Sequence, residues 1–184
     1  MFMKKLLFIL FGSLILTTTL SFSQSSQLDK KKGFKDFTLG DPYTKWSSSL
    51  SFLNSDNGVS YYKYTGYCCN EVFNYRLSEI RLGFAENKLQ IIYLITENQI
   101  KDRNEWLSYQ YSYLKSNLNS IFGESSGDMP AEKKGNVMCT WKGNNTFLIL
   151  EYQYMGVKGN SEKAWSEDRC TIMFALKPRQ NTGF

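Results

Sequence analysis

Two glutamates are the residues whose type and spacing could support acid–base chemistry. Glu79 and Glu151 are both predicted on the polar side of a β-strand, and a glycosidase needs two carboxyl groups roughly 5 to 10 Å apart. Arg81 is predicted on the same side of its strand as Glu79, where the two would form an ordinary surface ion pair. We therefore expect these carboxylates to be structural and assign no catalytic residue.

Histidine is absent from the sequence, and this absence removes most catalytic chemistry. It excludes Ser-His and Cys-His nucleophile pairs, the usual metal sites and the commonest general base near neutral pH. Catalysis by Cys68 or Cys69 would need a thiol pKa lowered by a neighbouring cation or a helix start, and neither is evident in the sequence. The sequence predicts a protein that is not an enzyme and that binds no cofactor.

The opening residues predict export. A basic start with Lys4 and Lys5 precedes the apolar run 6–16, which is too short to cross a bilayer because a span needs about 20 apolar residues. Small residues at the end of this segment predict cleavage after Ser23, the alternative being an uncleaved membrane anchor. The chain therefore divides into a signal peptide at 1–23, a polar linker at 24–36, a single α+β domain at 37–178 and a flexible tail at 179–184. We expect a periplasmic or extracellular protein with no stable membrane anchor after cleavage.

The charge balance argues against a nucleic-acid partner. Removal of Lys4 and Lys5 would lower the formal net charge from +5 to +3, whereas binding to phosphates needs many clustered cations. The densest cationic run, at 30–32, falls in the polar linker and is interpreted as a solvated segment.

The cysteines of an exported chain are candidates for disulfides. The sequence contains Cys68, Cys69, Cys139 and Cys170, which allow several connectivities. A bond between the adjacent Cys68 and Cys69 would close a strained ring, so we expect crossed pairing with Cys139 or Cys170 and leave the connectivity open. Zinc would need all four thiolates, and adjacent cysteines depart from the usual ligand spacing, so no metal is expected.

Two amphipathic helices are predicted to cover the sheet. The first begins at Asp41 and Pro42, a cap followed by a first-turn proline, and ends near Asn54. Its apolar residues recur at a spacing of three or four: Tyr43, Trp46, Leu50 and Leu53. The second runs from about residue 102 to 122 and stops at Gly123. Its buried stripe comprises Leu107, Tyr111, Leu114, Leu118 and Ile121.

Alternating apolar and polar residues predict half-buried antiparallel strands. The strands of the first half are expected at 59–65, 77–84 and 89–96, and those of the second half at 136–142, 146–154 and 169–176. In the hairpin of the first half, the core side should carry Ile80, Leu82 and Phe84 on one strand and Leu89, Ile91, Tyr93 and Ile95 on the next. The connection 156–168 is expected to be long and mobile.

The fold class is therefore α+β, with two helices packed on one face of an antiparallel sheet and a helix-plus-β-meander unit that is duplicated along the chain. This order, with Gly33-Phe34-Lys35-Asp36-Phe37-Thr38-Leu39-Gly40 before the first helix and Ile121-Phe122-Gly123 after the second, resembles small exported proteins of the β-lactamase-inhibitor-protein-like fold. The small outer-membrane assembly lipoproteins share that architecture. The resemblance implies a curved sheet whose uncovered face grips a partner protein. It carries over no functional position, and the lipid-anchor cysteine of the assembly lipoproteins is missing here.

The uncovered face of the sheet is the predicted binding surface, and its partner is expected to be another protein or a peptide. The residues predicted to line it are Glu79, Arg81, Met138, Thr140, Glu151, Gln153, Thr171 and Met173. A carbohydrate-binding or weakly hydrolytic envelope protein is the alternative, since tyrosine and tryptophan are abundant and two glutamates lie on this face. A structural envelope protein without a single ligand is a third interpretation.

Overall fold

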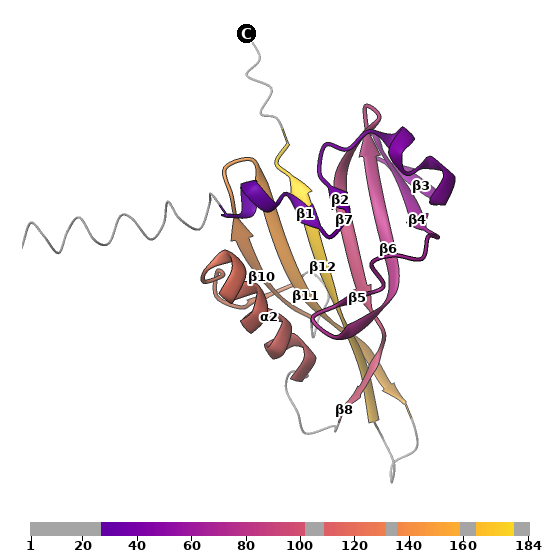
Figure 1. Ribbon diagram of the computed structural model, residues 1–184. Coiled ribbons are helices and arrows are strands. Elements are labelled where there is room, and N and C mark those ends of the chain that lie inside the picture. The colour runs from indigo at the N-terminus through magenta and orange to yellow at the C-terminus, as the bar shows by residue number, and fades with distance from the viewer. Residues whose placement is uncertain (1–26, 102–108, 132–135, 159–164, 179–184) are drawn as a thin grey trace, which may run out of the picture.

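The protein is built around one antiparallel β-sheet, whose first strands form two successive hairpins (Figure 1). The computed structural model describes residues 27–101, 109–131, 136–158 and 165–178. The expected signal peptide at 1–23 and the tail at 179–184 lie outside these residues. Hairpin turns at Asn57-Gly58 and Glu86-Asn87 have positive φ at both positions, as two-residue β-hairpins favour. The strands are β3 (Leu50–Asp56), β4 (Val59–Tyr64), β6 (Tyr75–Ala85) and β7 (Lys88–Thr96), with β5 (Glu71–Val72) paired to β6.

A second meander completes the sheet. It comprises β10 (Val137–Lys142), β11 (Thr146–Lys158) and β12 (Trp165–Leu176), with β9 (Met129–Pro130) on the β10 edge and β8 (Gln99–Lys101) paired to β12. The spatial order is β3-β4-β6-β7-β12-β11-β10-β9, so the last strands of the two meanders, β7 and β12, pair at the centre. The expected three-stranded meander is confirmed, although β11 and β12 extend into the segment that was expected to be a mobile connection.

One face of the sheet forms the core. A row of directly opposed residues crosses five strands and is buried throughout: Leu82, Ile92, Phe174, Leu148 and Trp141. Helix α2 (Tyr109–Phe122) packs on this face through Tyr111, Leu114, Leu118 and Phe122. The helix ends before Gly123, which has φ 81° and takes the left-handed position that the sequence predicts for it.

The N-terminal segment covers the rest of the same face, in front of the sheet in Figure 1. It contains a helical turn at 27–31 and the short hairpin of β1 (Gly33–Phe34) and β2 (Phe37–Thr38). Leu28 is 1% exposed and Phe37 also enters the core. Residues 27–36 therefore lie against the domain, whereas the sequence predicts a polar linker, because Leu28 enters the core and the half-buried Phe34 packs against it.

The prediction of a first helix, from Asp41 to near Asn54, is wrong. Tyr43–Lys45 (η1) and Ser47–Ser49 (η2) form two short 3₁₀ turns, and β3 follows directly. The Ser47 hydroxyl donates to the Thr44 carbonyl, which is the local bonding by which serine competes with a regular helix. The Asn57-Gly58 turn then pairs β3 with β4, and this hairpin leaves Phe52 60% exposed. Among the described residues α2 is the one long helix, so the fold is a sheet-rich antiparallel α+β domain.

The predicted core side of β7 is also wrong beyond Leu89. Gly83 pairs with Ile91 and Phe84 with Leu89, so the register shifts at a β-bulge. Leu89, Ile92 and Leu94 enter the core, while Ile91 and Tyr93 turn to the opposite face. The extra residue in the bulge reverses the alternation, and a strict period of two cannot register it.

Candidate functional site

The face of the sheet opposite α2 and the N-terminal segment is the candidate site, here called the open face. One row of opposed residues on it runs Arg81, Tyr93, Met173, Ile149 and Thr140, and the next runs Glu79, Ile95, Thr171, Glu151 and Met138. Gln153 follows Glu151 on the same side of β11, opposite Arg169. All eight residues that the sequence predicts for the site therefore lie on this one face.

Thr171 does not offer an accessible contact. It is 8% exposed, because its short side chain lies between Ile95 and Glu151, its direct neighbours on β7 and β11. Ile95 is buried beside it. The expectation that Thr171 contributes to the surface is corrected accordingly, and the larger residues around it form the surface instead.

An apolar cluster occupies the middle of the open face, and apart from Met173 its residues were missed by the sequence prediction. It consists of half-buried side chains on neighbouring strands: Tyr61, Ile91, Tyr93, Phe147, Ile149 and Met173. Ile91 and Tyr93 were assigned to the core because the bulge is invisible to a period of two. Phe147 and Ile149 could have been found, because the run Phe147 to Leu150 is apolar on both sides of its strand.

Gly83 leaves room for the aromatic part of this cluster. A Cβ at this position would lie 3.0 Å from the Tyr61 ring and 3.0 Å from Val59. The Tyr61 ring therefore covers the glycine, and its centroid is 6.3 Å from that of Tyr93. Burial raises the pKa of the Tyr93 phenol, so this ring stays neutral and behaves as an apolar group with one polar tip.

The polar groups around the cluster are bonded to one another. Arg81 donates to both carboxylate oxygens of Glu79 at 2.9 Å. This hydrogen bonding lowers the pKa of Glu79 and outweighs burial, which acts in the opposite direction; the charges of Arg81, Lys63 and Arg169 lower it further.

Glu151 is held in a separate network and does not meet Glu79. It accepts from Asn136 at 3.1 Å and from Gln153 at 3.0 Å, and Gln153 in turn accepts from Arg169 at 2.9 Å. Three strand spacings of about 4.8 Å separate Glu79 from Glu151 across the sheet, roughly 14 Å in all. That distance exceeds what two carboxyl groups can bridge in glycoside hydrolysis.

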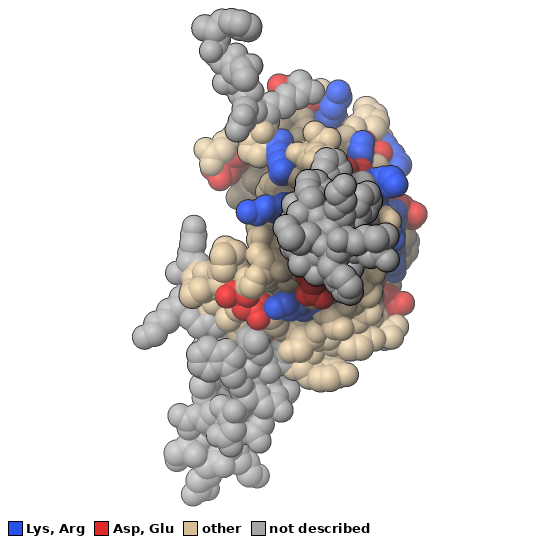
Figure 2. Space-filling model, turned by 90° about the vertical axis from the view of Figure 1, so that its left-hand side faces the viewer, with Lys and Arg blue, Asp and Glu red and all other residues tan. Residues whose placement is uncertain are grey.

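The β10 edge of the open face is sealed by the chain after α2. The Ser126 N–H donates to the Thr140 carbonyl, the Thr140 N–H donates to the Ser126 hydroxyl oxygen, and the two hydroxyls are 3.0 Å apart. Figure 2 shows both signs of charge interspersed with uncharged surface on the side of the molecule that it faces. Mixed charges of this kind do not indicate a phosphate-binding surface on that side of the molecule.

The segment Gly123-Glu124-Ser125-Ser126-Gly127 matches the Gly-x-Ser-x-Gly pattern of serine hydrolases. In those enzymes the serine lies between a strand and a helix, whereas Ser125 follows the end of α2 and its backbone N–H donates to Asn119. The chain also contains no histidine to act as the base. The match therefore carries no catalytic assignment.

All four cysteines are free thiols, so the expected crossed disulfides are not formed. Cys139 on β10 and Cys170 on β12 are buried on the core face, and burial raises the pKa of both thiols. Cys68 and Cys69 lie in the loop after β4. Burial and then the bond to Cys68 raise the pKa of Cys69 to about 12, so its thiol is a poor nucleophile at neutral pH.

Comparison with known proteins identifies no family for this chain, because it matches no protein-family model, no curated protein and no solved structure. Among the described residues, no helix combines the length and the apolar character that crossing a membrane requires.

Proposed function

We propose that this chain is an exported, non-enzymatic module that binds a protein partner through the open face. The observation that carries the proposal is the apolar cluster, whose residues remain half-exposed in the middle of a face that is otherwise hydrogen-bonded. Protein interfaces share this arrangement of an apolar, aromatic centre within a polar rim.

The surface fits a protein better than a small molecule. Small ligands favour enclosed pockets, and a cavity of about 500 Å³ lies on the covered side, with Leu94, Ile172 and Phe174 in its lining. The open face is instead an extended sheet surface spanning β4 to β11. A partner with an apolar patch of similar extent would bury the cluster.

The rim of the open face carries charges of both signs, which favours a partner with a complementary charge pattern. Lys63, Arg81 and Arg169 lie on this side together with Asp56, Glu79 and Glu151. Rim charges act mainly on the association rate and on the choice of partner. We therefore expect binding to weaken as the salt concentration rises.

Recovery of the partner from periplasm or medium tests the proposal. Met173→Asp places a charge in the centre of the cluster and should reduce partner recovery at least tenfold, an effect of about 1.4 kcal/mol or more. Arg81→Glu should reduce recovery less and weaken its salt dependence. Phe52→Asp is the matched control, because Phe52 is an exposed apolar residue that contacts Tyr62 on the covered side.

The outcomes separate the interpretations. Equal recovery by the wild type and both open-face variants rejects the open face as the binding surface. Loss of recovery with Phe52→Asp alone would move the interface to the covered side. Binding to a glycan array that Met173→Asp abolishes, without any protein partner, would replace the protein by a carbohydrate ligand.

A further inference from the structure

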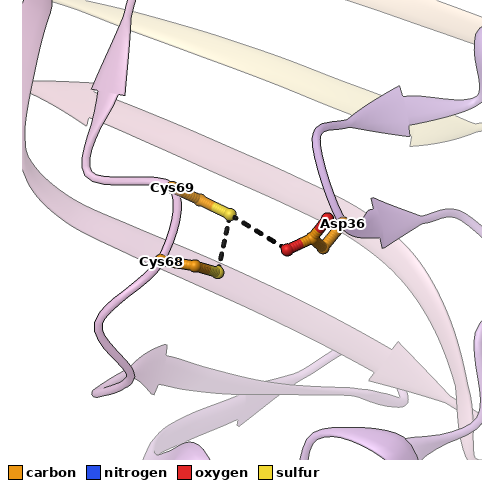
Figure 3. A group of neighbouring side chains, drawn as sticks. All are labelled: Asp36, Cys68 and Cys69. Atoms are coloured by element: carbon orange, nitrogen blue, oxygen red, sulfur yellow. Dashed lines mark hydrogen bonds between the residues drawn. The ribbon is translucent and has the colours of Figure 1, made fainter.

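Two adjacent thiols and a carboxylate meet on the covered side of the sheet (Figure 3). The Cys68 and Cys69 sulfurs are 2.6 Å apart, and the Cys69 thiol donates to Asp36 Oδ2 at 3.8 Å. The three ligand atoms all lie within 4.8 Å of one another. Tyr64 adds a fourth polar group, with its hydroxyl 3.2 Å from the Cys68 sulfur.

The turn that carries Asp36 and the loop that carries the two cysteines are distant in the sequence and are brought together by packing. Asp36 lies in the two-residue turn between β1 and β2, where Gly33 is required because a Cβ there would overlap the Phe37 carbonyl. Phe37 packs between Trp46 and Tyr64, at ring-centroid distances of 4.7 and 5.0 Å, and so fixes the turn against β4.

The cysteine loop is shaped by a second glycine. A Cβ at Gly66 would overlap the Tyr64 hydroxyl, so this glycine leaves room for the bond from Tyr64 to Cys68. Cys69 has φ 69°, an uncommon conformation for a residue with a side chain, and it directs the thiol inwards, where it is 8% exposed. Local backbone strain of this kind often accompanies a functional site.

We propose that Asp36, Cys68 and Cys69 form a binding site for one thiophilic divalent cation of the zinc class. Thiolates are the preferred ligands of such ions, and a carboxylate completes many of their sites. Asp36 is exposed and gives the cation a path from solvent. Lys45 lies beside the site, where its ammonium donates to the Asp36 backbone carbonyl at 3.4 Å and pairs with Asp41 at 2.8 Å.

Binding requires one local movement. With metal–sulfur bonds of about 2.3 Å, two sulfurs in a tetrahedral site lie roughly 3.7 Å apart. The two thiols must therefore separate by about 1 Å from their present contact. Cys68 is half-buried and can make this movement by rotating its side chain towards solvent.

Cation titration of the reduced protein tests the site. The full chain is reduced and kept under anaerobic conditions, and its four thiols are confirmed by counting after denaturation. Cd²⁺ should then produce a thiolate-to-metal charge-transfer band that saturates at one ion per chain, and a large excess of Zn²⁺ should compete for the same site. Cys68→Ser and Cys69→Ser should each weaken Cd²⁺ binding more than about a hundredfold, because loss of even an outer partner of a ligand costs about 10- to 100-fold.

Two further variants keep the test falsifiable. Asp36→Asn should weaken binding about tenfold while leaving the fold intact, because Asp36 lies in an exposed turn. Cys139→Ala is the matched control, since it also removes one thiol and should leave the stoichiometry and the band unchanged. Absence of the band in the reduced wild type, or its persistence in a chain carrying both Cys68→Ser and Cys69→Ser, overturns the proposal. The site lies on the side of the sheet away from the open face, so its failure would leave the proposed partner binding untouched.

Discussion

Asp29 attaches the N-terminal segment to the sheet, and its replacement should destabilise the fold. Its carboxylate accepts four hydrogen bonds from the turn between β10 and β11. The donors are the Asn144 N–H at 2.6 Å, the Asn145 and Thr146 N–H groups at 3.0 Å, and the Thr146 hydroxyl at 2.8 Å. Gly143 leaves room for this arrangement, because a Cβ there would be 2.6 Å from Asp29 Oδ1.

The expected magnitude follows from these bonds. A hydrogen bond to a charged group contributes about 1.5 to 3 kcal/mol, but Asn144 and Asn145 are exposed, and water replaces much of what they lose. Thr146 is buried, so in Asp29→Ala its N–H and hydroxyl would lose their hydrogen-bond acceptor without gaining water in its place. We therefore expect Asp29→Ala to lower the free energy of unfolding by about 2 to 3 kcal/mol, well below the sum of four bonds. Asp29→Asn keeps the acceptor Oδ1 but turns an amide donor towards the Asn144 N–H, and should cost about 1 to 2 kcal/mol.

The same carboxylate predicts a pH dependence. Burial acts to raise the pKa of Asp29, but the hydrogen bonds from Thr146, Asn145 and Asn144 outweigh it and lower the pKa below the usual value. A carboxyl group with a lowered folded pKa contributes stability above its unfolded pKa, and that contribution is lost as the pH falls through the folded pKa. The difference between wild type and Asp29→Asn should thus be constant from pH 7 to about 5 and shrink below about pH 4.

Urea unfolding at pH 7, 5 and 3.5 measures both effects. Gly143→Ala is a second perturbation of the same contact, since its methyl group must displace the Asp29 carboxylate. A loss below about 0.5 kcal/mol for Asp29→Ala, the range of ordinary surface substitutions, would refute the role of this contact. A difference between wild type and Asp29→Asn that persists unchanged at pH 3.5 would refute its electrostatic part.

Two further predictions concern the core and the rim of the open face. Leu114→Ala empties a fully buried position of α2 against the sheet and should lower the free energy of urea unfolding by about 2 to 5 kcal/mol. Tyr109→Ala, on the exposed side of the same helix, should lower it by less than about 1 kcal/mol. Similar losses for the two variants would contradict the orientation of α2. Glu79→Gln should change the free energy of unfolding by less than about 1 kcal/mol, because its partner Arg81 is 42% exposed to solvent. This change should diminish in 1 M NaCl. A larger loss that does not depend on salt would show that the Glu79–Arg81 pair has a buried structural role.

The open face was only partly predictable from the sequence. Period-two alternation on β6, β11 and β12 placed Glu79, Glu151 and Met173 on one side, because that pattern depends on the strand alone. The apolar centre of the open face could not be predicted from the sequence. Tyr93 alternates with Ile92 and Leu94, which are equally apolar, and the bulge that decides between them exists only when β6 and β7 are paired.

The thiol–carboxylate cluster shows the limit of local reasoning more sharply. Asp36 and Cys69 are separated by 33 positions and meet because Phe37 packs against Trp46 and Tyr64. The sequence alone made Cys68 and Cys69 a strained pair to be avoided and placed Asp36 in a linker. Only the packed core brings them together.

What the sequence determined by itself was local, namely most of the strands and the helix α2 with its stop at Gly123, since each follows from near neighbours in the chain. The tertiary structure decided the rest. It selected a strand at 50–56 where local spacing favours a helix, because β4 offers backbone partners before and after a bulge between Phe52 and Asn54. It also docked residues 27–38 onto the core and turned Tyr93 outwards, since both outcomes depend on surfaces contributed by distant segments.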